Sequence, residues 1–124
     1  MEMKLELVLV PVADADRAKA FYVEQVGFRL DHDVRPSPAM RVVQLTPPGS
    51  ACSIVLGTGL TDMVPGTLKG LHLVVADVAQ VRSELLGRGV AVGELIHYPG
   101  GITYAYFRDP DGNSWALQQI SSRA

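Results

Sequence analysis

The sequence of 124 residues lacks several features that whole classes of protein require. It has a single cysteine, Cys52, so no disulfide can form within one chain. No apolar run approaches the roughly 20 residues that cross a bilayer. Lysine and arginine are not clustered and the net charge is −2, which argues against a nucleic-acid-binding surface. We therefore expect a cytoplasmic protein that has no membrane or nucleic-acid partner.

A nucleotide-binding fingerprint is also missing. The twelve glycines are scattered, and no G-x-G-x-x-G pattern opens a helix after a strand. The composition itself is that of an ordinary globular protein, with 48% hydrophobic and 19% charged residues. A chain of this length can bury a real core as one compact unit.

The order of expected elements occurs twice along the chain. In each half a short strand leads to a helix that is capped by an aspartate, Asp14 or Asp77, and stopped by a glycine, Gly27 or Gly89. Three more strands follow each helix. The expected strands of the first half cover residues 4–12, 28–34, 40–46 and 51–57. Those of the second half cover residues 71–76, 90–98, 102–108 and 114–120.

This duplication predicts an α+β fold built from two tandem βαβββ modules. The first module covers residues 1–57 and the second residues 70–124, and a linker rich in Gly, Thr and Pro joins them over residues 58–69. Neither half can readily bury its apolar face alone. The two modules should therefore pack together as a single domain over residues 1–124.

Two segments carry a family resemblance. "VPVADADRAKAFYVEQVGF" near the start and "YFRDPDGNSWAL" near the end resemble the vicinal oxygen chelate superfamily. That superfamily includes glyoxalase I, extradiol dioxygenases, fosfomycin-resistance thiol transferases and bleomycin-binding resistance proteins. The resemblance implies curled sheets that form a cup for a small molecule, helices on the outer face, and homodimers with shared sites. Function stays open, because some members catalyse reactions and others only bind.

The resemblance also implies where a metal ion would be held. Enzymes of the family commonly use four His and Glu side chains, which leave open positions for substrate oxygens. The family histidine precedes the aspartate at the helix start by seven residues, which reaches Leu7 in one module and Gly70 in the other. The family glutamates fall at Ala116 and at either Ser53 or Val55, two alternatives that the strand register leaves open. None of these is a conventional ligand, so we expect no metal and no other cofactor.

His72 lies two residues beyond Gly70 and corresponds to Leu9 in the first module. Side chains alternate along a strand, so both residues share the face of the family's ligand position and are expected to point into the cup. One histidine does not make a metal site. His72 is therefore interpreted as a polar group of a binding pocket.

Tyr104 and Tyr106 are two residues apart and share one face of a strand. The resemblance turns Phe107 toward the helix and the tyrosines toward the cup, where their rings suit a flat, partly polar ligand. Structural packing is the alternative for both tyrosines. Trp115 alternates with Ala116 and is expected to face the helices.

The other candidates have plainer alternatives. His97 and Tyr98, beside "PGG", either cover the mouth of the cup or form an exposed loop pair. Gln118 is otherwise an amide bound to water. Arg41 either meets a carboxylate or a ring or, by default, is solvated at the surface. The segment "DPDGN" is interpreted as a turn with no catalytic role. The complete predicted ligand-binding set is Leu9, Met40, His72, His97, Tyr98, Tyr104, Tyr106 and Gln118.

Three functions remain open from the sequence. The first is metal-independent sequestration of a hydrophobic aromatic compound, an antibiotic or natural product, as in the antibiotic-binding branch of the family. The second is a glyoxalase-type lyase or isomerase, with either a displaced metal or His72 as general base and Tyr104 or Tyr106 as donor. The third is an accessory dimer without a small ligand.

Overall fold

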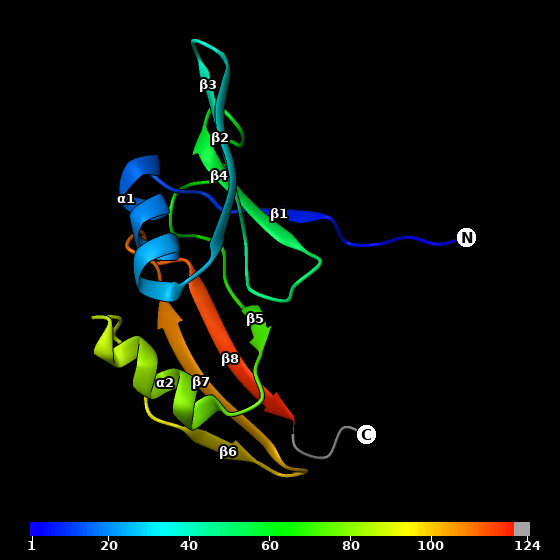
Figure 1. The fold of residues 1–124 in the computed structure, drawn as a ribbon, viewed down its shortest axis with the longest axis vertical. Coiled ribbons are helices and arrows are strands. Elements are labelled where there is room, and N and C mark those ends of the chain that lie inside the picture. The colour runs from blue at the N-terminus through cyan, green and yellow to red at the C-terminus, as the bar shows by residue number, and fades with distance from the viewer. Residues whose placement is uncertain (121–124) are drawn as a thin grey trace.

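The computed structural model describes residues 1–120 and contains two modules in succession (Figure 1). The elements of the first module are β1 (Leu7–Leu9), α1 (Ala15–Ala20), the π-helical η1 (Phe21–Val26), β2 (Arg29–Ser37), β3 (Met40–Thr46) and β4 (Ser53–Thr58). Those of the second are β5 (Leu71–Val74), α2 (Val78–Gly87), β6 (Ile96–Tyr98), β7 (Ile102–Arg108) and β8 (Ser114–Ile120). This order confirms the predicted α+β class with two tandem modules.

The two modules have the same sheet topology. The first sheet has the order β1-β4-β3-β2 and the second the order β5-β8-β7-β6. In each, the first strand runs parallel to the last strand, and the remaining pairs are antiparallel. Both helices lie on the same side of the molecule (left in Figure 1), and the hydrophobic core lies between them and the sheets.

The helices begin where the aspartates predict. Asp14 accepts a hydrogen bond from the Arg17 backbone N–H, and Asp77 accepts one from Gln80, each at 3.1 Å. These bonds satisfy N–H groups that have no partner inside the helix. The first helix continues from α1 into η1 and ends at Gly27, whose φ of 94° is accessible to glycine at little cost.

Five strands differ from their predicted bounds, and the largest differences are those of β1, β2 and β6. β1 begins at Leu7 and not at residue 4, because its partner strand β4 begins opposite Leu7. β6 keeps only the end of the predicted segment 90–98, and Val92 forms an isolated bridge to Phe107. β2 continues through Pro36 into the expected loop. An edge strand with register shifts tolerates a proline that donates no hydrogen bond.

Trp115 joins the two modules in the core, on the helix side as predicted. Its ring stacks on Phe107 at 6.0 Å and meets Phe28 of the first module edge-on at 5.6 Å. Its indole N–H donates to the Tyr22 hydroxyl at 2.9 Å. The modules therefore share one aromatic core.

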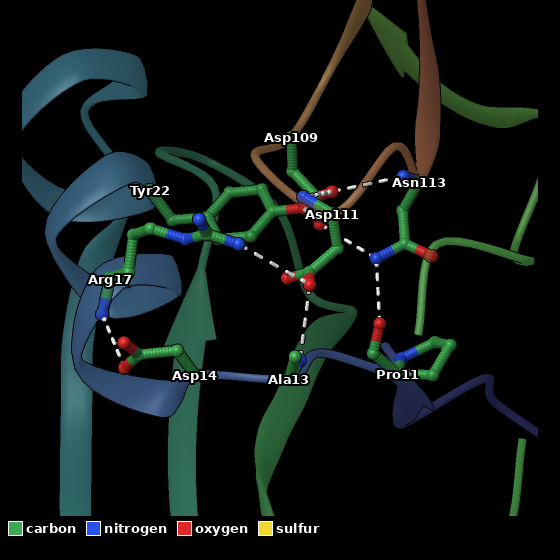
Figure 2. A network of polar contacts seen from close by, with 8 residues as sticks. All are labelled: Pro11, Ala13, Asp14, Arg17, Tyr22, Asp109, Asp111 and Asn113. Atoms are coloured by element: carbon green, nitrogen blue, oxygen red, sulfur yellow. Dashed lines mark hydrogen bonds and ion pairs between the residues drawn. The ribbon is translucent and has the colours of Figure 1, made fainter. Parts of the chain in front are cut away.

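The turn between β7 and β8 contains Asp109 and Asn113, and it does more than reverse the chain (Figure 2). The Asn113 amide donates to Asp109 Oδ2 and to the carbonyl of Pro11, both at 2.8 Å. Asp109 Oδ2 also accepts from the Tyr22 hydroxyl at 2.8 Å. Burial and the Asp109 carboxylate raise the pKa of Tyr22, which keeps its phenol protonated as a donor.

Through Asp111, the same turn also contacts the segment that leads into α1. Its Oδ1 accepts from the Ala13 backbone N–H at 3.1 Å and lies 3.5 Å from the Arg17 guanidinium (Figure 2). Asn113 Oδ1 accepts from Leu68, in the segment between β4 and β5. "DPDGN" is thus a turn, as expected, that also fastens the second module to the first.

Candidate functional site: an aromatic face of the second sheet

One face of the second sheet carries aromatic rings that no helix of residues 1–120 covers. Residues that lie directly opposite each other on neighbouring strands share a face of the sheet. The pairs His72–Ala116, Val74–Gln118, Ala116–Tyr106, Gln118–Tyr104, Tyr104–Ile96 and Ile102–Tyr98 therefore define one surface across β5, β8, β7 and β6. We call this surface the open face. The opposite face, with Ala105, Phe107, Trp115 and Leu117, is buried in the core.

Tyr104 is the centre of the open face. Its ring meets His72 edge-on at 5.7 Å and Tyr98 edge-on at 5.5 Å, and it stacks beside Tyr106 at 5.8 Å with an interplanar angle of 12°. Tyr98 and Tyr106 are 46% and 43% exposed. Such a cluster offers large apolar ring surfaces together with hydroxyl groups, a combination that suits a flat ligand with a few polar atoms.

The phenol of Tyr106 on the open face is uncharged at neutral pH. Desolvation has the largest effect on the pKa of Tyr106 and raises it. The hydrogen bond with the Tyr98 hydroxyl has the next largest effect, in the same direction. A raised pKa holds the phenol in its protonated form at neutral pH, so it can donate a hydrogen bond to a ligand.

The structure brings together His72, Tyr98, Tyr104, Tyr106 and Gln118 of the predicted set. These residues share one face because of the register in which β5, β8, β7 and β6 pair, and the bounds of β7 and β8 are those predicted. Their role as ligand contacts stays a prediction.

His97, Leu9 and Met40 are not part of the open face. His97 pairs with Thr103 on the opposite face of the second sheet, and its Nδ1 lies 3.1 Å from the Thr103 hydroxyl. Leu9 and Met40 belong to the first sheet. Leu9 lines a separate hollow of about 220 Å³ between Val55 and the segment that follows β4.

A polar cluster on the first sheet was missed by the sequence analysis. Asp31 accepts hydrogen bonds from the Thr46 hydroxyl and from Arg29, and these hydrogen bonds lower the pKa of its carboxyl. Because Thr46 donates to Asp31, the Ser53 hydroxyl at 2.7 Å donates to Thr46. The pairing of β2 with β3 shifts register between Leu30 and His32, and this shift places the Asp31 carboxylate beside Thr46. Regular alternation gives no signal of such a shift.

The expectation that Arg41 is solvated is wrong. Its guanidinium donates twice to Asp33, at 2.9 and 2.8 Å, and once to Asp16 at 2.8 Å. These carboxylates raise the pKa of Arg41, and Arg41 and Lys19 hold the pKa of Asp33 well below its usual range. Arg41 is therefore a bridge between strands and helix, since Asp16 and Lys19 belong to α1.

Strand register resolves the alternative that the family's metal positions left open. Leu9 lies opposite Val55 in β4, and His72 lies opposite Ala116 in β8. Since His72 corresponds to Leu9, it is Val55, and not Ser53, that corresponds to Ala116.

The four positions that would hold the family's metal ion are occupied here by Leu7, Val55, Gly70 and Ala116, and they do not fit a divalent ion. Their side chains have no nitrogen, oxygen or sulfur atom to bind one. Within residues 1–120, no group of three or more His, Cys, Asp or Glu side chains is placed to hold a metal.

The fold and the site define a class of protein. The chain belongs to the glyoxalase/bleomycin resistance protein/dioxygenase superfamily, whose family model matches residues 4–117. Within the described residues, no helix is long and apolar enough to cross a membrane. No curated protein sequence matches the chain at a significant level.

Solved structures provide the particular relatives. TnmS3, an antibiotic binding protein from Streptomyces sp. CB03234, is 42% identical with a TM-score of 0.86, over 97% of this chain and 98% of that chain. A glyoxalase/bleomycin resistance protein from the same organism is 43% identical with a TM-score of 0.81, over 94% and 100%. A superfamily member from Sphaerobacter thermophilus DSM 20745 is 30% identical with a TM-score of 0.85, over 95% and 98%.

Proposed function

We propose that the protein binds a hydrophobic aromatic small molecule, an antibiotic or related natural product, and sequesters it in the cytoplasm without a metal ion. The observation that carries this proposal is the cluster of His72, Tyr98, Tyr104 and Tyr106 on a face that no helix covers. The similarity to TnmS3, described as an antibiotic binding protein, supports the same function.

The energetics favour a flat ligand. Each aromatic pair contributes about 0.5–1.5 kcal/mol beyond the burial of its area. Burial itself contributes about 25 cal/mol per Å² of apolar surface, part of which offsets the entropy lost on association. The neutral phenol of Tyr106 and the amide of Gln118 supply hydrogen bonds that orient the ligand.

We also propose a homodimer whose sites are shared between chains. Residues 1–4 run away from the rest of the chain (Figure 1), and exposed apolar side chains lie at alternate positions, Met1, Met3 and Leu5. Such a segment can extend a sheet of a second copy. Leu9 and Met40 belong to the sheet that does not carry the open face, so in this proposal they contact a ligand bound to the partner's open face.

Titration with polycyclic aromatic compounds tests the proposed binding. We expect the wild-type protein to bind an anthraquinone or enediyne in such a panel with micromolar affinity or better, measured by calorimetry. Tyr104→Ala removes the central ring and should weaken binding at least about tenfold, which corresponds to loss of about 1.4 kcal/mol. His97→Ala is the matched control, because His97 lies on the opposite face. No binding by any compound, or equal binding by Tyr104→Ala, would overturn the proposal.

Sedimentation analysis tests the dimer. The full chain should sediment as a dimer, and a variant without residues 1–4 should shift toward the monomer. A full chain that stays monomeric at micromolar concentration would contradict the shared-site arrangement.

A further inference from the structure

The imidazole of His72 has its proton on a defined nitrogen. Its Nδ1 lies 2.7 Å from the backbone carbonyl oxygen of Gly70. A carbonyl oxygen only accepts hydrogen bonds, so Nδ1 is the donor. In a neutral imidazole the second nitrogen, Nε2, then has a free lone pair and acts as an acceptor.

The backbone holds this carbonyl in place. Gly70 has a φ of +80°, a left-handed conformation that strains residues with a side chain. Its N–H donates to the Ser114 hydroxyl at 2.9 Å, at the start of β8. The tautomer of His72 therefore follows from the local backbone and needs no ligand to set it.

The backbone fixes the hydrogen-bonding role of His72, whereas the other polar groups of the open face can change theirs. The hydroxyls of Tyr98, Tyr104 and Tyr106 can rotate, and each serves as donor or acceptor. Gln118 carries both an oxygen and an N–H₂ group. His72 is exposed, and within residues 1–120 its ring forms one hydrogen bond, to Gly70. Nε2 is thus a group with a single fixed role on a surface of otherwise adaptable ones.

His72 also lies at the border of the open face. Its ring meets Tyr104 on one side, and it lines a hollow of about 330 Å³ between the modules, together with Leu5 and Ser53. A ligand that stacks on the tyrosines and reaches this border displaces water from Nε2. An acceptor that loses water and gains no donor costs binding free energy.

We propose that His72 Nε2 selects ligands that carry a hydroxyl group, by accepting its hydrogen bond at the edge of the bound ring system. This inference rests on the proposed function and adds the chemical class of the ligand: a flat aromatic molecule with a hydroxyl donor. A ligand that has an ether oxygen or a plain methyl group at that edge leaves Nε2 unpaired and is discriminated against.

The tautomer can be tested without any ligand. In mildly alkaline buffer, the ¹⁵N chemical shifts of the His72 ring should show a protonated Nδ1 and an unprotonated Nε2. His97→Gln simplifies the spectrum and leaves the open face unchanged, because His97 is on the opposite face. A predominant Nε2–H form would overturn the inference.

Selectivity is tested with three matched probes: 2-(hydroxymethyl)anthraquinone, its methyl ether and 2-methylanthraquinone. We expect the wild-type protein to bind the hydroxymethyl compound about tenfold more tightly than the other two. His72→Phe keeps a ring of similar shape but has no acceptor, so it should bind all three alike. His97→Phe, the matched control, should retain the wild-type preference.

The outcomes separate this inference from the proposed function. Equal binding of all three probes by the wild-type protein overturns the role of His72 and leaves aromatic binding standing. A preference that persists in His72→Phe does the same. If the wild-type protein binds none of the probes, the proposed binding of flat aromatics and the inference both fail.

Discussion

At the scale of single residues, the Tyr22 hydroxyl connects two buried groups. It donates to Asp109 at 2.8 Å and accepts from the indole of Trp115 at 2.9 Å, and Tyr22 is fully buried. A buried polar group that loses its partner costs about 1–3 kcal/mol. The hydroxyl thus satisfies a carboxylate and an indole N–H that water cannot reach.

Removal of this hydroxyl should destabilise the protein. We expect Tyr22→Phe to lower the free energy of unfolding by about 2–3 kcal/mol, because it leaves both partners short of one bond. Urea denaturation followed by circular dichroism measures the change. Tyr106→Phe is the control, since Tyr106 is 43% exposed and its change should stay within about 0.5 kcal/mol. Equal losses in the two variants would contradict the bridging role of Tyr22.

The residues of the open face could be predicted where strands are regular. Alternation along β7 places Tyr104 and Tyr106 together, and His72 of β5 joins them on the same face across β8, which pairs with both strands. The contacts of Asp31 could not be predicted, because a register shift moves a side chain relative to its partner strand without any mark in the hydrophobic pattern. His97 and Tyr98, at the end of the predicted strand 90–98, were expected to act together at the mouth of the cup, but as neighbours in β6 they point to opposite faces.

At the scale of elements, β2, β3 and α1 are joined by charges. Asp33 of β2 accepts from Arg41 of β3 and from Lys19 of α1, and Arg41 also binds Asp16 of α1. These partners, Arg41 first and Lys19 second, hold the pKa of Asp33 below its usual range. The edge strand β2, which contains Pro36, is thereby tied to its neighbour and to the helix.

This cluster predicts how stability depends on pH. A carboxyl whose pKa is lowered by folding stabilises the native state above its unfolded pKa of about 3.9, and the contribution is lost as pH falls further. Asp33→Asn should therefore cost about 1–2 kcal/mol at neutral pH, and its difference from the wild type should shrink in acid. Urea unfolding over a range of pH measures this, with the exposed Asp62→Asn as control. A difference that does not vary with pH would contradict the assignment.

The strands whose bounds match their predicted segments all have a partner strand on both sides. β7 and β8 pair with each other along their whole length, and both match their predicted segments. β1 and β6 are edge strands with one partner each, and both are shorter than their apolar runs. Hydrophobic pattern reports burial, but a strand also needs a partner backbone, which a single sequence does not reveal.

At the scale of the whole molecule, the repeat in the sequence predicted two modules but not how they join. They join through the aromatic core around Trp115 and through Asn113, which is fully buried and binds Pro11, Leu68 and Asp109. The bond from Asn113 to Pro11 links positions 102 residues apart, and the bond to Leu68 links positions 45 residues apart. A pattern with helical or strand periodicity carries no information on such long-range bonds.

This junction predicts that both modules unfold together. Trp115 is the single tryptophan and lies at the junction, so its fluorescence reports the interface, while far-UV circular dichroism reports both modules. We expect the two signals to follow one urea transition. Asn113→Ala leaves buried partners unpaired and should shift both signals to lower urea by the same amount, with about 2–4 kcal/mol lost. If the fluorescence of the variant changes at lower urea than its circular dichroism, the modules separate before they unfold, and the junction does not make them one cooperative unit.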